Sequence, residues 1–141
     1  MIKEYARISC NSIKDSFTFH DLKRKIISKR GCHCEKCKSK TNILIADHII
    51  PISLGGKEFE ESNLQLLCSK CNKEKTARDI YKLNILKKVG FIEMCSNYSW
   101  WFYDIEEVLD SKIRPRGNKT KLQLIEEHKE IIDEFLKINF R

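Results

Sequence analysis

The chain has 141 residues, of which 41% are hydrophobic and 33% are charged. This length supports one compact domain with extensions and excludes two large domains. Lys and Arg outnumber Asp and Glu by 27 to 20, and the net charge of +7 predicts a polyanionic partner. No stretch approaches the roughly 20 apolar residues of a membrane span, and residues 1–10 lack a secretory signal's apolar centre, so we expect a cytoplasmic protein without a membrane partner.

The first predicted element is a helix that Thr18 caps and Gly31 ends, with Ile26 on its apolar face. Residues 32–39 are short, polar and rich in cysteine. This composition is typical of a knuckle around a metal ion rather than of a packed element.

Two short β-type segments follow. Residues 43–50 are rich in β-branched side chains, and residues 64–67 form a second apolar run. Pro51 and the pair Gly55 and Gly56 mark a loop between them. We therefore expect a hairpin with a long loop.

The rest of the chain predicts two longer helices and an aromatic segment. One helix covers residues 72–89 and stops at Gly90, and residues 91–103 favour strands whose limits the sequence does not give. The last helix covers residues 121–139, because Thr120 has capping-box spacing to the glutamine three residues later. The side chains expected to face inward on the two helices are Ala77, Ile80, Leu83, Leu86, Val89, Leu122, Ile125, Ile132, Phe135 and Leu136.

Four cysteines form two pairs with the Cys-x-x-Cys spacing of zinc knuckles. They are Cys34, Cys37, Cys68 and Cys71. A structural Zn²⁺ ion bound to four thiolates would clamp the hairpin between the pairs and replace part of a core. The alternatives are reduced buried thiols or a redox pair, and Cys32 is an alternative ligand to Cys34. The odd count and close pairing of the cysteines favour metal binding over a disulfide scaffold. Cys10 and Cys95 are expected to be core or surface thiols.

Polar residues in a specific order lie between and beside the cysteine pairs. In chain order they are Asp47, His48, Pro51, Gly55, Gly56, Asn63, Asn72 and Lys75, with the run Leu64–Leu67 before the second pair. This order resembles the HNH endonuclease family in its zinc-stapled ββα-metal form, over about residues 31–79. The resemblance implies an α+β fold with a treble-clef-like ββα-metal core, a four-cysteine zinc site and flanking helices. We expect a helical extension over residues 1–30, a nuclease core over residues 31–90 and a C-terminal extension over residues 91–141.

The resemblance also implies roles for individual residues. His48 matches the general base, Asp47 matches a ligand of a catalytic divalent cation, and Asn63 matches the residue that orients the histidine. Asn72 matches the last motif position, which makes the chain an H-N-N variant with an amide oxygen as second ligand. Two oxygen ligands favour Mg²⁺ or Mn²⁺ over a second zinc ion. The implied products carry 5′-phosphate and 3′-hydroxyl ends.

The residue types support the same reaction independently of the family resemblance. Phosphodiester hydrolysis needs a deprotonated water and positive charge at the transition state. A neutral imidazole can take the proton of that water. Asp47 and His48 are neighbours on a strand, so a bulge or a distorted strand end is expected to aim both at one phosphate. A helix that starts at Asn72 would add the positive end of its dipole.

Basic residues are predicted to contact DNA phosphates. They are Lys75, Arg78, Arg114, Arg116 and Lys119, and the last three belong to a loop over residues 112–121 that contains no acidic residue. The alternative is a solvated helix face and a solvated linker. Trp100, Trp101 and Tyr103 are expected to form core or dimer contacts rather than to stack on bases.

The sequence thus predicts a metal-dependent endonuclease acting on double-stranded DNA. The alternatives are a zinc-stabilised DNA-binding module without catalysis, and a nuclease directed at RNA. A double-strand cutter with one active site per chain commonly needs two copies, so a homodimer is an expectation. The pattern does not separate restriction, homing, phage and recombination enzymes.

Overall fold

The computed structural model of the chain describes residues 13–41, 43–94 and 100–140. The chain forms two compact units that divide between Arg78 and Asp79, inside helix α3 (Ser69–Val89). Within the described ranges, no helix combines the length and apolar composition that crossing a bilayer requires. The expected domain limits at residues 30 and 90 stay a prediction.

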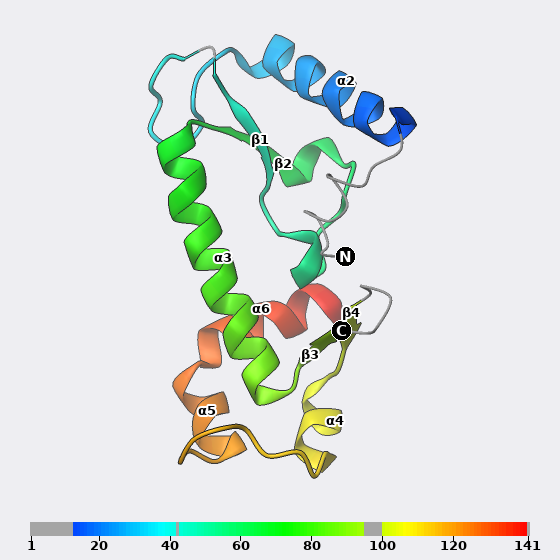
Figure 1. The fold of residues 1–141 in the computed structure, drawn as a ribbon, viewed down its shortest axis with the longest axis vertical. Coiled ribbons are helices and arrows are strands. Elements are labelled where there is room, and N and C mark those ends of the chain that lie inside the picture. Colours follow the sequence, from blue (N-terminus) through cyan, green and yellow to red (C-terminus); the bar gives the residue numbers. More distant parts are fainter. Residues whose placement is uncertain (1–12, 42, 95–99, 141) are drawn as a thin grey trace. The chain divides into compact units, whose positions relative to one another are not determined.

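The first unit begins with helix α2 (Ile13–Arg30), drawn in blue in Figure 1. The prediction that Thr18 caps this helix was wrong, because the helix starts upstream and no Gly or Pro between Ile13 and Thr18 interrupts it. Gly31 ends the helix as predicted. Its φ is 92°, and its N–H donates to the carbonyl of Ile27 at 2.8 Å.

Strands β1 (Ile45–His48) and β2 (Leu64–Leu67) form the predicted antiparallel hairpin. The pairing is regular from Ile45 opposite Leu67 to His48 opposite Leu64, so these four pairs contain no bulge. Of the two expected distortions the bulge is absent, and β1 ends at His48, where bends follow at residues 49–50. The long loop between the strands contains two 3-10 turns, η1 (Ile52–Leu54) and η2 (Glu61–Asn63).

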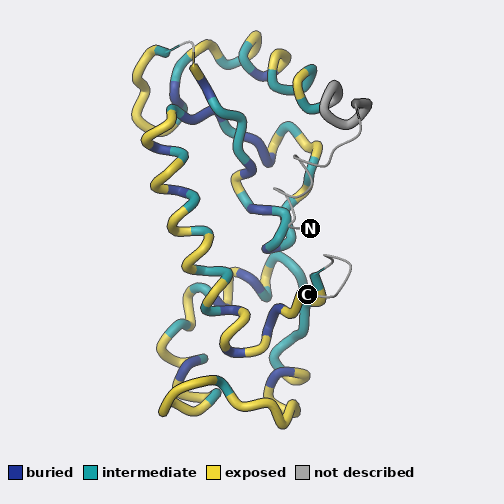
Figure 2. The backbone as a smooth tube through the Cα atoms, viewed as in Figure 1, coloured by how far each residue is buried: buried dark blue, intermediate teal, exposed yellow. Residues whose placement is uncertain are grey.

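The core of the first unit lies between α2 and this hairpin (Figure 2). Its buried members are Ile26, Leu44, Leu64 and Leu66, and Phe19, Leu22, Ile27 and Ala46 pack against them. A smaller cluster joins Leu67 to the cysteines of the two pairs. The hairpin is therefore held by apolar contacts on one side and by the cysteine cluster on the other.

Helix α3 starts at Ser69, three residues before the predicted start at Asn72. Ala77 is exposed and Ile80 is 50% exposed, so the inward orientation predicted for both was wrong. In this half of the helix the buried positions are instead Cys71 and Lys75, which are one turn apart. The second half follows the prediction better, since Leu86 and Val89 are buried and Leu83 is half-buried. Gly90 ends the helix with a φ of 108°.

The second unit contains the hairpin of β3 (Ile92–Met94) and β4 (Trp100–Phe102), which confirms the strands expected in this segment. Phe135 lies at the centre of its core, with ring centroids 6.1 Å from Phe91 and 5.2 Å from Phe102. Helix α4 (Ile105–Asp110) was not predicted, although Asp104 and Glu107 form a capping box at its start.

The predicted last helix is divided into α5 (Lys121–Glu127) and α6 (Lys129–Asn139), which meet at His128. The capping box of Thr120 and Gln123 is present as predicted. Leu122 is 65% exposed, and its inward orientation was wrong because the prediction assumed one continuous helix with one apolar stripe. Cys10 and Cys95 lie outside the described residues, so their predicted roles are not addressed.

Candidate active site and metal centre

The sulfur atoms of the four predicted zinc ligands lie within 4.8 Å of one another. Tetrahedral Zn–S bonds of about 2.3 Å separate two sulfurs by about 3.8 Å. The distance from Cys37 Sγ to Cys68 Sγ is 3.8 Å. Cys32 is outside this group, and its Sγ lies 3.2 Å from the carbonyl oxygen of Thr41. The structure therefore brings Cys34, rather than Cys32, to the cluster.

The thiol pKa values show that the cluster favours partial ionisation. Burial opposes ionisation of Cys34, but backbone N–H groups of Cys37, Cys68 and Lys36 outweigh it and lower the pKa of Cys34 to about 6. Burial and hydrogen bonds with the other thiols raise the pKa of Cys71 to about 12. A divalent soft cation is the group that would stabilise all four thiolates together, so this donor set fits structural zinc.

Each cysteine pair is organised by the backbone around it. The N–H of Cys37 lies 3.5 Å from Cys34 Sγ, and the N–H of Cys71 lies 3.5 Å from Cys68 Sγ. The second contact uses the first turn of α3, and the N–H of Asn72 donates to the carbonyl of Cys68. Backbone N–H groups at the start of α3 therefore organise the cysteine knuckle, and the expected attraction of a phosphate to this helix N-terminus stays a prediction.

A polar bridge that sequence reasoning missed ties α2 to the first cysteine pair. Arg30 donates to the carboxylate of Glu35 at 3.2 Å and to the carbonyls of Leu64 and Glu61 at 2.8 and 3.0 Å. The Glu35 carboxylate also accepts from the N–H of Leu66 at 2.8 Å. The available signal in the sequence was the place of Arg30 at the end of α2, directly before Gly31.

His48 is the last residue of β1, and only 4% of it is exposed. Its Nε2 lies 2.9 Å from the carbonyl oxygen of Glu58 in the hairpin loop. Because a carbonyl only accepts, Nε2 carries the hydrogen and Nδ1 carries the lone pair of the neutral ring. The ring also packs 6.0 Å from Phe19 of α2. The loop thus selects one tautomer of the imidazole.

Asn63 holds this loop closed through its side-chain amide, which is buried. Its Oδ1 accepts from the N–H of Ile50 at 2.9 Å, and its Nδ2 donates to the carbonyls of Ile50 and Lys57 at 3.0 and 2.8 Å. One amide therefore links the residues after β1 to the segment before Glu58, whose carbonyl orients His48.

Gly56 permits the close approach of the two loop segments. A Cβ atom at this position would lie 1.7 Å from the carbonyl oxygen of Ile50 and 2.9 Å from Asn63 Nδ2. Sequence reasoning recognised the Gly pair only as a turn. The close backbone approach is a separate reason for glycine here.

Asp47 and Lys75 form an ion pair between β1 and α3, with 2.9 Å between Oδ2 and Nζ. Asp47 therefore reaches α3 while the neighbouring His48 reaches the loop, as alternation along a strand requires. Asn72 lies on the first turn of α3 and is half-buried. Carboxylate and amide oxygens of this kind fit Mg²⁺ or Mn²⁺ better than zinc.

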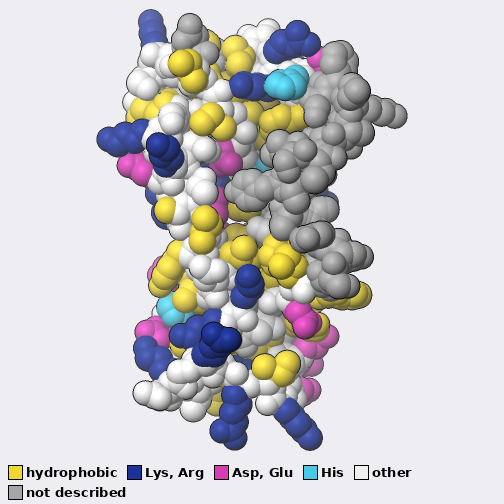
Figure 3. All heavy atoms as spheres, in the orientation of Figure 1, with side chains coloured by type: hydrophobic (Ala, Val, Ile, Leu, Met, Phe, Trp, Pro, Cys, Tyr) yellow, Lys and Arg dark blue, Asp and Glu magenta, His cyan; other side chains and the backbone are white. Residues whose placement is uncertain are grey.

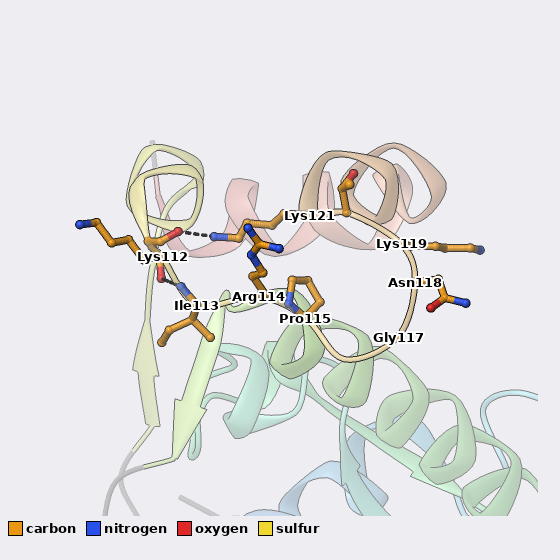
Figure 4. Close-up of a pocket in the computed structure, with 10 residues that line it drawn as sticks. Lys112, Ile113, Arg114, Pro115, Gly117, Asn118, Lys119 and Lys121 are labelled. Carbon is orange, nitrogen blue, oxygen red and sulfur yellow. Dashed lines mark hydrogen bonds between the residues drawn. The ribbon is translucent and has the colours of Figure 1, made fainter.

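The predicted basic loop connects α4 and α5 and encloses a depression of about 660 Å³ (Figure 4). Arg114 points into the ring formed by the loop, and Lys119 points away from it. Lys121 donates to the carbonyls of Val108 and Ser111, both at 2.7 Å, and thereby caps α4. Figure 3 shows Lys and Arg side chains projecting from the surface of the second unit.

The basic residues predicted to bind DNA differ in their availability. Lys119 Nζ lies 2.7 Å from both carboxylate oxygens of Glu127, and Lys75 is 8% exposed and paired with Asp47. Arg78, Arg114 and Arg116 are exposed. The structure therefore leaves these three guanidinium groups accessible to solvent.

A hairpin and a helix joined by a four-cysteine cluster define a ββα unit of the zinc-stapled class. Residues 34–78 match the family model described as HNH endonuclease, which confirms the resemblance drawn from the motif. The match covers about a third of the chain, and this segment is an HNH domain. An HNH domain indicates a nuclease or nucleic-acid-binding function. Searches of curated proteins and of solved structures returned no match.

Proposed function

We propose that this protein is a metal-dependent DNA endonuclease in which His48 is the general base and Asp47 and Asn72 hold a divalent cation. The observation that carries the proposal is the hydrogen bond from His48 Nε2 to the Glu58 carbonyl, because it leaves the lone pair of the neutral ring on Nδ1. A buried histidine held in one tautomer suits proton abstraction from water. The HNH domain over residues 34–78 supports the same class of reaction.

In the proposed reaction, His48 Nδ1 takes a proton from water, the water oxygen bonds to phosphorus, and the bond from phosphorus to the 3′ oxygen breaks. The leaving oxygen gains a proton from solvent, which gives 5′-phosphate and 3′-hydroxyl ends. Bound Mg²⁺ or Mn²⁺ supplies positive charge for the transition state and for the leaving oxygen. Asn63 acts as a positioning residue, since it holds the loop that carries the Glu58 carbonyl.

Double-stranded DNA is the proposed partner. The net charge of +7 favours a polyphosphate, and the exposed guanidinium groups of Arg78, Arg114 and Arg116 suit phosphate contacts. Lys119 is a weaker candidate for such a contact than the sequence indicated, because Glu127 already neutralises it. Lys75 is treated separately below.

The test is a plasmid assay with purified protein, supercoiled DNA and Mg²⁺ or Mn²⁺, with and without EDTA. We expect metal-dependent nicking that His48→Gln abolishes, because glutamine can still donate to the Glu58 carbonyl but cannot act as the base. His20→Ala is the matched control, since His20 is an exposed histidine on α2. Zinc content and thermal melting verify that both variants are folded.

The outcomes separate the candidate functions. A wild-type protein that shifts plasmid mobility in a gel and never nicks it is a zinc-stabilised DNA-binding module without catalysis. Preferential cleavage of RNA or single-stranded DNA in parallel reactions would replace the proposed substrate. Sedimentation of the protein with and without DNA tests the expected homodimer, and linear product formed without a nicked intermediate would indicate paired active sites.

A further inference from the structure

The ion pair of Asp47 and Lys75 is unusual because both partners are largely buried. The exposed fractions of the two side chains are 21% and 10%, and Oδ2 of Asp47 lies 2.9 Å from Nζ of Lys75. This oxygen is itself buried and accepts no hydrogen bond from the described residues. The geometry at Oδ2 and Nζ does not meet the angles of a hydrogen bond, so the contact is an ion pair held by electrostatic attraction.

A buried carboxylate requires positive charge nearby, because removing it from water is costly when nothing compensates it. In this structure an ammonium group supplies that charge. In the proposed function a divalent cation binds the same carboxylate. Lys75 and the metal ion would therefore bind the same carboxylate, and their positive charges would repel each other there.

We propose that Lys75 is the resting counter-ion of Asp47 and competes with the catalytic cation for its carboxylate. Binding of the divalent cation is linked to release of Lys75, so the lysine lowers the affinity of the site for metal. This inference rests on the proposed function, since it uses the metal site assigned there. It gives Lys75 a role different from the direct DNA contact predicted from the sequence.

The competing explanation is a permanent structural ion pair. Lys75 shares the buried stripe of α3 with Cys71, so its ammonium could serve only to neutralise Asp47 and stabilise the unit. The two explanations predict different changes in metal affinity when Lys75 is replaced. A competing lysine weakens metal binding, and its removal tightens it. A purely structural lysine leaves metal affinity unchanged or supports it by holding Asp47 in place.

The experiment measures Mn²⁺ binding by the zinc-loaded full chain without DNA, by electron paramagnetic resonance of free Mn²⁺. We expect Lys75→Met to bind Mn²⁺ about tenfold or more tightly than wild type, because a positive charge next to the ligand is removed. Lys75→Arg keeps the charge and should bind as weakly as wild type. Lys73→Met is the matched control, because Lys73 is an exposed lysine on the same turn of α3, and it should not change the affinity.

Asp47→Asn separates failure of this inference from failure of the proposed function. If Asp47→Asn removes Mn²⁺ binding while Lys75→Met binds no more tightly than wild type, the metal site stands and the competition is wrong. If wild type and all variants fail to bind Mn²⁺, or if Asp47→Asn binds like wild type, the assigned metal site is wrong and the inference fails with it. If Lys75→Met loses its zinc or its fold, Lys75→Gln is measured in its place. An Mn²⁺ affinity of Lys75→Gln equal to that of wild type would show that Lys75 does not compete with the cation.

Discussion

Glu35 and Leu66 exchange two hydrogen bonds, both of 2.8 Å: the N–H of Glu35 donates to the carbonyl of Leu66, and the N–H of Leu66 donates to the Glu35 carboxylate. This exchange joins the first cysteine pair to β2. We expect Glu35→Ala to lower the free energy of unfolding by about 1–3 kcal/mol, because it leaves the N–H of Leu66 and part of Arg30 without an acceptor. Urea denaturation measures this, with Lys36→Ala as the exposed neighbouring control. Equal stability of the two variants would contradict it.

Gly56→Ala should destabilise the hairpin loop by more than about 2 kcal/mol, because the added Cβ would overlap the carbonyl oxygen of Ile50. Gly117→Ala is the control. Its φ is +96° but nothing lies within 4 Å of the added atom, so the loss should be only about 1 kcal/mol. Thermal unfolding followed by circular dichroism compares the two. A larger loss for Gly117→Ala would show that loop closure does not depend on Gly56.

Asn63→Asp should strongly reduce the proposed nuclease activity while leaving the zinc site intact. The substitution keeps the shape but replaces the Nδ2 donor by an oxygen that faces the carbonyls of Ile50 and Lys57. Displacement of the loop should lower the nicking rate by about 100-fold, since small errors in catalytic geometry have effects of that size. The assay reports nicking rate and zinc content of the same sample. Unchanged nicking would remove Asn63 from its positioning role.

Zinc removal should unfold the first unit selectively. The purified protein should contain one zinc ion, and a strong chelator or Cys68→Ser should expose β1, β2 and the start of α3 to solvent, because the ion replaces core at this point. Hydrogen–deuterium exchange should show lost protection there and retained protection in β3, β4 and α6. The protein could instead contain no zinc when purified under reducing conditions and still show protection in β1, β2 and the start of α3. That result would indicate reduced thiols rather than a zinc site.

The carboxyl pKa of Glu127 should lie below its ordinary value, chiefly because Lys119 donates to it. A depressed folded-state pKa means that the pair stabilises the protein above the unfolded-state pKa and that this contribution is lost as the pH falls through the folded-state pKa. Lys119→Met should return the pKa towards its ordinary value. Carboxyl carbon NMR during a pH titration measures both proteins. The difference should shrink at high salt, because the pair is exposed.

The sequence was most informative where the physical requirement is local. The spacing of the cysteine pairs, the capping box at Thr120 and the positive-φ stops at Gly31 and Gly90 each depend on a few neighbouring residues, and all are found in the structure. The hairpin was predicted for the same reason, because its two short apolar segments have turn residues between them.

Contacts between distant segments could not be predicted in the same way. Lys75 was predicted to contact DNA, with a solvated helix face as the alternative, and nothing in the sequence indicated its burial against Asp47. The Glu58 carbonyl carries no side-chain signal that could connect it to His48. The start of α3 was placed too late because its first turn contains Ser69 and Cys71, residue types with only modest helix propensity.

The cysteine cluster is assembled from both ends of the segment that contains Asp47, His48 and Asn63. During synthesis the second cysteine pair leaves the ribosome last, and Asn72 follows it directly. A translation product that stops before Cys68 contains the histidine but lacks half of the sulfur ligands and the helix that carries Asn72. Under the proposed function, incomplete chains should therefore be unable to cut the DNA of the cell that makes them, and only chains that extend past Asn72 and bind zinc should become nucleases.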